Sequence, residues 1–171
     1  MIEIIDCPFA NEIKENIISW LTNQQFNSVT GEACKTKEYI EIHIQEIKRL
    51  FDWIESHLSE ISDKFAYYTN SLYNSDIRSN TKKFKIDSYW FLNYPLNSWI
   101  RPHNHFPHAL SFTYYISAPQ NSAPLILDHK EYFVKEGQLL VFPSYLMHWV
   151  PPAKVEGRTL ISGDIVYLSR F

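Results

Sequence analysis

The sequence predicts one α+β domain, mainly β, in which N-terminal helices pack on a sandwich or barrel of the jelly-roll type. The first part of the chain carries apolar residues at helical spacing, whereas the second part carries short runs rich in aromatic and β-branched residues. Most of the nine prolines separate these later runs. Short strands divided by turns are typical of a jelly roll, so residues 1–82 are expected to be mostly helical and residues 83–171 to form the β-barrel core.

Two amphipathic helices are expected in the first part of the chain. Ile13, Ile17 and Leu21 recur at helical spacing, with charged and amide side chains between them. A longer pattern runs from about Tyr39 to Tyr68, where isoleucine, leucine and phenylalanine recur at spacings of two to four opposite lysine, glutamate and aspartate. No proline interrupts this segment, so it is expected to be an amphipathic helix with at most one break.

Strands are expected from about Lys83 onward. The runs that predict them are FKIDSYWFLNY, LSFTYYIS, PLILD, EYFVKE, QLLVFPS and TLISGDIVYL. Proline, asparagine, aspartate and glycine separate these runs, as turn residues do between strands. No internal repeat, low-complexity tract or linker divides the chain, so residues 1–171 are expected to form a single domain.

Composition excludes several classes of protein. The 171 residues carry a formal net charge of -3, and the pI is about 6.1, so the chain lacks the basic surface of a nucleic-acid binder. Cys7 and Cys34 form no C-x-x-C pair, which argues against a disulfide framework and a zinc knuckle. The N-terminus has no leader pattern, and no stretch approaches the roughly 18 apolar residues of a membrane span. We therefore expect a cytoplasmic protein without a nucleic-acid or membrane partner; the oligomeric state stays open.

Three of the seven histidines are crowded into the segment RPHNHFPH. His103 and His105 are separated by one residue, and on a strand two such side chains point to the same face, as a shared metal ion requires. A histidine-rich surface loop explains the same segment equally well. The segment alone therefore leaves both interpretations open, and His108 is expected to lie on the surface.

A second segment, FPSYLMHWVPPAKVEGRTL, strengthens the metal interpretation. His148 follows a strand-like run, and a barrel can return it to the strand that carries His103 and His105. Three imidazoles suit iron, zinc, copper and nickel alike. Arg158 begins a later strand, and an arginine that points into an apolar barrel needs an anion such as a dicarboxylate. The alternative is that Arg158 is a surface charge after the turn at Gly157.

At these residues the sequence resembles the 2-oxoglutarate- and iron(II)-dependent oxygenases. The resemblance lies between about residues 90 and 166, in WIRPHNHFPHALSFTYYIS, PLILD, EGQLLVFPSYLMHWVPP and GRTLISGDI. It is greatest to a small branch related to prolyl 4-hydroxylases that is common in bacteria and phages. In that branch an H-x-H-P segment precedes an S-G-x-Y-Y strand, and G-x-L-x-x-F-P-S-x-x-x-H-x-V leads to an arginine. The resemblance implies a cupin-like double-stranded β-helix.

The resemblance also implies roles for individual residues. His103 and His148 take the places of the two invariant histidines that bind iron(II), and His105 takes the place that an aspartate usually holds. Arg158 stands where a basic residue pairs with the distal carboxylate of 2-oxoglutarate. Tyr115, or its neighbour Tyr114, is placed to offer a hydroxyl to the same carboxylate.

Further positions complete the comparison with this branch. Asn93 is a candidate polar partner in the same pocket. The sequence departs from the branch at Phe112, where glycine is frequent, and at Phe106, which separates His105 from Pro107.

The third metal ligand admits alternatives. A site for this chemistry usually has two histidines and one carboxylate, and three neutral ligands would leave a divalent ion with its full charge, which favours a dianionic co-substrate. Asp128 and Asp164 are alternative carboxylates to His105. Asp128 precedes His129 at the end of a predicted strand, where an aspartate more often forms a turn.

The implied activity is hydroxylation of a C–H bond, coupled to conversion of 2-oxoglutarate and O2 to succinate and CO2. The substrate stays open between a peptidyl proline, a free amino acid, a nucleobase and a small metabolite, because the fold does not choose among them. Two other functions compete with this one. The first is a cupin-like metalloenzyme that uses three histidines without 2-oxoglutarate and does not require Arg158. The second is a non-catalytic barrel module, which loss of iron binding would mark.

Overall fold

The computed structural model describes residues 2–28, 31–69 and 83–168. This part of the chain forms two helices and ten strands. In chain order they are β1 (Glu3–Asp6), α1 (Ala10–Leu21), β2 (Cys34–Lys35), α2 (Gln45–Thr69), β3 (Lys83–Tyr94), β4 (Ile100–His103), β5 (Leu110–Ser117), β6 (Leu125–Leu127), β7 (Lys130–Tyr132), β8 (Gln138–Pro143), β9 (His148–Val150) and β10 (Arg158–Leu168).

The helices follow the apolar periodicity with one correction. Helix α1 buries Ile13, Ile17 and Leu21 along one face, as its spacing predicts. Helix α2 begins at Gln45 rather than near Tyr39. Burial in the preceding segment 40–44 alternates between partly buried and exposed residues, which is the two-residue period of an extended chain. The isoleucines of that segment therefore pack from an extended segment and not from a helix.

All the named strands pair in antiparallel fashion and form two sheets. The larger sheet has the order β1-β8-β5-β10-β3-β2, and the smaller has the order β4-β9-β6-β7. The expectation of a mainly β fold with short strands in the second half is confirmed. Strands β1 and β2, which come from the part expected to be helical, were not expected; they form the two edges of the larger sheet.

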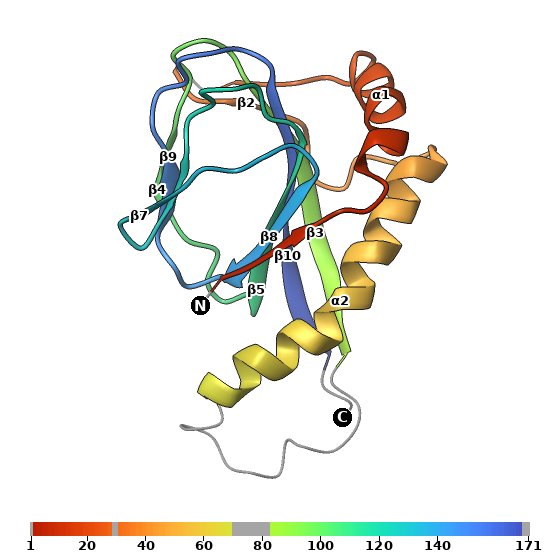
Figure 1. Ribbon diagram of the computed structural model, residues 1–171, viewed down its shortest axis with the longest axis vertical. Helices are drawn as coiled ribbons and strands as arrows, with labels where there is room; N and C mark the ends of the chain where they lie inside the picture. Colours follow the sequence, from red (N-terminus) through yellow and green to blue (C-terminus); the bar gives the residue numbers. More distant parts are fainter. Residues whose placement is uncertain (1, 29–30, 70–82, 169–171) are drawn as a thin grey trace.

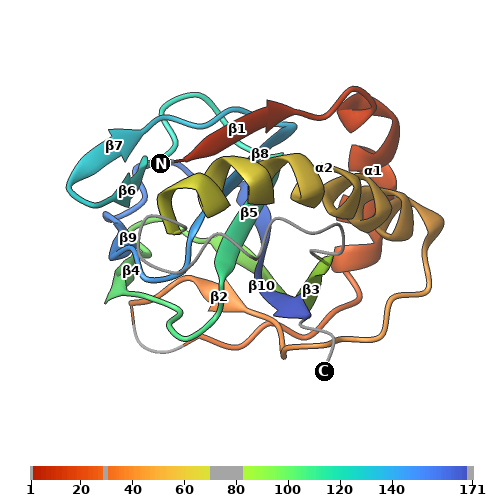
Figure 2. The same ribbon diagram turned by 90° about the horizontal axis from the view of Figure 1, so that it is seen from below.

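The molecule is built in three layers. Both helices cover one face of the larger sheet, and the strands of the smaller sheet lie on its other side (Figure 1; Figure 2 shows α2 running across this face). One apolar core lies between the helices and the larger sheet, and a second lies between the two sheets. No helix among the described residues is long and apolar enough to cross a membrane.

Strand β5 contributes to both cores, because both of its faces are buried. Phe112 and Tyr114 belong to the core beneath the helices, whereas Tyr115 belongs to the core between the sheets. Phe112 stands at a position where glycine is frequent in the related branch, and its neighbour on β10 explains why a large residue fits there. It pairs with Gly163 of β10, and a Cβ added at Gly163 would collide with the Phe112 ring. The lack of a side chain at Gly163 thus leaves room for the Phe112 ring.

Strand β3 contains a β-bulge that changes which side chains face the functional site. Its pairing with β10 passes from Ser88 opposite Asp164 to Ile86 opposite Ile165, which leaves Asp87 as the extra residue. Before the bulge, Ile86 packs on the helix side of the sheet. After it, Trp90 and other even-numbered residues of β3 face the space between the sheets.

Candidate metal and anion site

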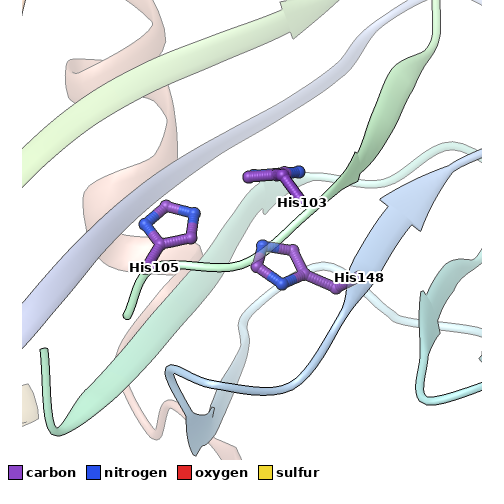
Figure 3. Close-up of side chains that lie close together, drawn as sticks. All are labelled: His103, His105 and His148. Carbon is purple, nitrogen blue, oxygen red and sulfur yellow. The ribbon is translucent and has the colours of Figure 1, made fainter. Parts of the chain in front are cut away.

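His103, His105 and His148 come together at the end of the space between the sheets. Each offers one nitrogen, and these three atoms lie within 4.8 Å of one another. His103 ends β4, His148 begins β9, and the two residues pair across the strands. The three imidazole rings lie close together (Figure 3), with ring centroids 4.2 to 5.1 Å apart.

His105 reaches this centre by a different route from the one expected. Strand β4 ends at His103, so the two histidines do not share a strand. The backbone N–H of His105 instead donates to the Ser144 carbonyl oxygen at 2.8 Å, which ties this loop to the segment before β9. The loop therefore brings the His105 ring to the other two rings without the alternation of a strand.

Two of the imidazoles are oriented by the backbone next to them. Nδ1 of His103 lies 2.8 Å from the Arg101 carbonyl oxygen, and Nδ1 of His148 lies 3.0 Å from the Leu146 carbonyl oxygen. A carbonyl oxygen only accepts hydrogen bonds, so each Nδ1 carries the ring proton. Each Nε2 then keeps its lone pair, as a metal ligand requires.

The third imidazole is oriented by a buried carboxylate. Nδ1 of His105 lies 2.9 Å from Oδ1 and 3.0 Å from Oδ2 of Asp164. The hydroxyls of Ser88 and Ser111 donate to the same carboxylate at 3.2 and 2.9 Å. Burial alone would raise the pKa of Asp164, but the hydrogen bond and charge of His105 outweigh it and hold that pKa below its ordinary value. Asp164 is therefore ionised at neutral pH, and His105 also presents Nε2 to the centre.

The protonation states suit a metal ligand set. Burial lowers the pKa of His148 to about 4, and it also lowers the pKa of His103. Both rings are therefore neutral at pH 7, which is the form that binds a metal ion. A donor set of three imidazoles fits iron(II) and other divalent transition metals.

Arg158 lies in the same cavity as the histidines and has donors to spare. Its side chain is 1% exposed, and Nη2 donates to the Tyr115 hydroxyl at 3.2 Å. The guanidinium lies over the Tyr94 ring at 4.5 Å and the Tyr115 ring at 5.3 Å. Nε and Nη1 are buried without any partner, and no acidic side chain among the described residues pairs with this arginine. A buried arginine whose donors find no acceptor among the described residues is suited to bind an anion.

One cavity of about 350 Å³ joins these groups. Its lining includes Arg158 and Tyr115 at one part and the three histidines at another. The hydroxyl of Thr113, which also lines it, is buried and has no hydrogen-bond partner. Among the described residues, the buried side-chain N and O atoms without a hydrogen-bond partner thus all belong to two residues that line this cavity, where a ligand with acceptor atoms would satisfy them.

Two residues expected in the pocket lie elsewhere. Tyr114 occupies the opposite face of β5 from Tyr115, and its ring contacts that of Trp53 on α2 with the centroids 6.4 Å apart. Asn93 is exposed, because it alternates with Leu92 and Tyr94, which line the cavity. Since successive side chains of a strand point to opposite faces, neither residue reaches the cavity.

The alternative carboxylate ligands also lie outside the histidine group. Asp128 is exposed in the turn between β6 and β7, where it and His129 both have positive φ angles, of 47° and 64°. Two-residue hairpin turns require such angles. Asp164 contacts the Nδ1 side of His105, away from the nitrogen offered to the centre. His108 is half-buried rather than on the open surface, and its Nδ1 lies 3.0 Å from the His105 carbonyl oxygen.

Sequence reasoning missed Thr113 and the serines that hold Asp164. A signal was present for two of them. Ser111 and Thr113 precede Tyr115 by four and two residues in β5, so the strand period places all three on one face. Ser88 gave no such signal, because the bulge at Asp87 sets its direction.

Comparison with known proteins gives a fold and no closer relationship. No family model and no curated protein matches the sequence. Among solved structures, a prolyl 4-hydroxylase from Pseudomonas putida superposes with a TM-score of 0.66 at 15% identity, over 99% of this chain and 92% of that one. A viral collagen prolyl hydroxylase from Paramecium bursaria Chlorella virus-1, solved with 2-oxoglutarate, gives 0.61 at 12% identity, over 99% and 96% of the chains.

A third similar structure is HygX from Streptomyces hygroscopicus, solved with nickel and 2-oxoglutarate bound. It gives a TM-score of 0.61 at 12% identity, over 96% of this chain and 82% of that one. At such low identities the likeness concerns the fold alone. The chain therefore has the fold of prolyl 4-hydroxylases and other 2-oxoglutarate- and iron(II)-dependent oxygenases over nearly its whole length.

Proposed function

We propose that this protein is an iron(II)- and 2-oxoglutarate-dependent dioxygenase that hydroxylates an organic substrate. One observation carries the proposal: a fully buried arginine with two unpaired donors lines the same cavity as three histidines that each present Nε2. The histidines alone would suit several metals and reactions. The arginine adds the requirement for an anion, and 2-oxoglutarate meets it, because one end of this molecule is a carboxylate and its other end can chelate a metal ion.

Different residues would bind the metal ion and the co-substrate. His103, His105 and His148 would hold iron(II) through Nε2. Bound iron(II) and 2-oxoglutarate would supply the oxidising chemistry, in which 2-oxoglutarate and O2 become succinate and CO2 and a C–H bond becomes C–OH. Arg158 would pair through Nε and Nη1 with the distal carboxylate of 2-oxoglutarate, a charge-assisted and bidentate contact.

Further residues would fix the co-substrate and keep water out. The Thr113 hydroxyl, which has no partner among the described residues, would bind an oxygen of the same ligand. The Tyr115 hydroxyl, already hydrogen-bonded to Arg158, would support the arginine. Leu160 and Phe142 give the cavity apolar walls. Apolar walls that exclude water strengthen the electrostatic contacts inside the cavity and limit hydrolytic side reactions.

The remaining expectations about this chain belong to the same proposal. The two facing sheets would be those of a double-stranded β-helix of the jelly-roll type, and residues 1–171 would act as one domain. Both cysteines are free, which agrees with a reducing, cytoplasmic location. The similar structures include a collagen prolyl hydroxylase and a protein solved with hygromycin B, so the fold does not identify the substrate.

A second function is favoured by one feature, the imidazole of His105 in place of a ligand carboxylate. Cupin-like metalloenzymes that use three histidines without 2-oxoglutarate would share it. They would have no use for a buried arginine with unpaired donors, which is why we place this function second. A non-catalytic module comes third, since it would need neither the three free nitrogens nor Arg158.

Anaerobic titration of 2-oxoglutarate into the iron(II)-loaded protein separates these functions. The proposal predicts a saturable charge-transfer absorption and, in air, succinate formation even without a substrate. Iron binding without any response to 2-oxoglutarate would favour the cupin-like function. Failure to bind iron(II) would indicate the non-catalytic module.

A further inference from the structure

Asp164 lies next to the three histidines, and the proposed function gives it no role. Asp164 is 4% exposed and sits on β10, six residues after Arg158. It is not one of the residues whose donor atoms cluster at the centre. Its carboxylate instead contacts Nδ1 of His105 at 2.9 Å and lies 3.8 Å from Nδ1 of His108, so its closest contact with the three histidines is the one with the His105 imidazole.

The three histidines differ in what holds their Nδ1 atoms. For His103 and His148 the acceptor is a backbone carbonyl oxygen two residues earlier, which the local chain supplies. For His105 it is a carboxylate 59 residues away in sequence. Only this imidazole is polarised by a full negative charge, which raises the basicity of Nε2 and makes it a stronger ligand.

The net charge of the proposed metal site gives a second reason to assign a role to Asp164. Three neutral imidazoles leave a divalent ion at a charge of plus two, whereas two imidazoles and one carboxylate leave it at plus one. Asp164 lies directly behind the imidazole that replaces the carboxylate, and its charge is buried there. The ion, the three imidazoles and Asp164 together would then carry a net charge of plus one again. The negative charge would lie behind the His105 ring and not on an atom that binds the ion.

The carboxylate is itself held in place, which a chance contact would not require. Ser88 and Ser111 donate to its two oxygens from β3 and β5, the strands on either side of β10. The Ser111 hydroxyl is in turn 2.8 Å from that of Ser144. Ser144 also accepts the hydrogen bond from the His105 backbone. The loop, the imidazole and the carboxylate are thus joined in one buried network.

We propose that Asp164 is a positioning residue for the metal centre: through His105 it supplies the negative charge that a ligand carboxylate would supply directly, and it fixes the proton of His105 on Nδ1. This inference rests on the proposed metal site and deepens it. It assigns the charge of the site to a residue on β10, distant in sequence from the three ligands.

The test is the affinity of the metal-free protein for cobalt(II), measured by competition with a chelator, in the variant Asp164→Asn. The amide has the same shape, but its NH2 group can face Nδ1 of His105 and force the proton onto Nε2. We expect the affinity to fall by roughly 10- to 100-fold, as for loss of other partners of ligand histidines. The ligand-field absorption of bound cobalt(II) should also change, which a purely structural role would not cause.

A matched control removes the same charge nearby. Asp87 is 3.4 Å from Nε2 of His108 and 44% exposed, and Asp87→Asn should leave cobalt(II) affinity unchanged. Thermal unfolding of each metal-free variant checks that it folds. If Asp164→Asn does not fold, Ser111→Ala removes one of the hydrogen bonds to the carboxylate and should give a smaller loss of affinity in the same direction.

A double-mutant cycle shows whether the effect passes through His105. In a His105→Ala background, Asp164→Asn should cause no further loss of cobalt(II) affinity. An equal loss in both backgrounds, or wild-type affinity in Asp164→Asn alone, would overturn the inference while leaving the proposed function standing. Absence of metal binding by the wild-type protein would overturn the proposed function, and this inference with it.

Discussion

Replacing Arg158 by methionine should separate co-substrate binding from folding stability. Methionine fills a similar volume without charge, so the variant removes the proposed carboxylate contact and leaves the cavity wall in place. We expect the variant to keep its metal affinity, because the three ligand nitrogens do not depend on Arg158. We also expect it to lose nearly all affinity for 2-oxoglutarate.

The size of the loss follows from the two unpaired donors, Nε and Nη1. Truncating one partner of a buried, hydrogen-bonded charge pair costs about 3–5 kcal/mol, because the other charge is left buried and unpaired. Since about 1.4 kcal/mol corresponds to a tenfold change, the Kd for 2-oxoglutarate should rise by roughly two to four orders of magnitude.

The stability of the ligand-free protein should respond in a different way. Methionine removes two buried donors that lack partners, each of which costs about 1–3 kcal/mol. It also removes the hydrogen bond to Tyr115 and the contacts with the rings of Tyr94 and Tyr115, which contribute a similar total of a few kcal/mol. These effects nearly cancel, so urea unfolding of the ligand-free variant should change by less than about 2 kcal/mol.

The assay is an anaerobic titration of 2-oxoglutarate into the iron(II)-loaded proteins, followed by charge-transfer absorption. Arg49→Met is the matched control, because Arg49 is 51% exposed and pairs with Glu12 on the helix side of the molecule. It should bind 2-oxoglutarate as the wild type does. Equal affinities in the wild type and Arg158→Met would refute the reasoning and place the carboxylate contact elsewhere.

Three further predictions concern the same cavity. His103→Ala and His148→Ala should each abolish stoichiometric iron(II) binding, measured by metal analysis after desalting; unchanged stoichiometry in both would remove the metal assignment. Thr113→Val should raise the Kd for 2-oxoglutarate by roughly 10- to 100-fold, because a hydrogen bond to a charged group contributes about 1.5–3 kcal/mol; an unchanged titration would exclude the hydroxyl from the contact. Burial lowers the pKa of His148 to about 4, so below pH 6.5 the unfolded chain takes up a proton that the folded, metal-free protein does not, and stability is lost as the pH falls. Urea unfolding should show a loss of about 2 kcal/mol from His148 between pH 7.5 and pH 5, and a pH dependence no smaller in His148→Gln than in the wild type would contradict this.

The sequence was enough to predict the layers of the fold and to predict that His103, His105 and His148 come together. Apolar periodicity marks both helices because each buries one continuous face, and runs of aromatic and β-branched residues mark the main strands. It could not mark β1 and β2, which are short edge strands with partly polar composition. The isoleucines of segment 40–44 are two residues apart, and they were predicted to be part of the helix. A spacing of two is instead the period of an extended chain.

The direction of the tyrosines in β5 could not be predicted for a physical reason. A strand with one solvent face shows alternation of polar and apolar residues, and this alternation reveals which side is inside. Every residue of β5 from Leu110 to Ile116 is buried, because helices cover one face and the smaller sheet the other. The burial pattern therefore does not distinguish Tyr114 from Tyr115, and only the resemblance favoured Tyr115, which the paired sheets place in the cavity.

The partner of His105 lay beyond sequence reasoning for another reason. His105 and Asp164 are 59 residues apart, and their contact depends on the pairing register of β5 with β10. A shift of one residue would turn Asp164 to the other face of the sheet. Asp164 was therefore considered as a direct ligand, whereas its carboxylate contacts Nδ1 of His105.

The bulge at Asp87 has a consequence for how this chain can vary in length. Shortening β3 by that one residue would let a regular ladder form with β10, but it would turn one half of the strand over. Ile86 would then leave the helix side, or Trp90 would leave the ring of His105, on which it stacks at 5.4 Å. Substitution of the half-exposed Asp87 should be tolerated far better than its deletion. Homologous chains that keep this metal centre should accordingly keep the number of residues between Ile86 and Trp90, whatever side chains they carry there.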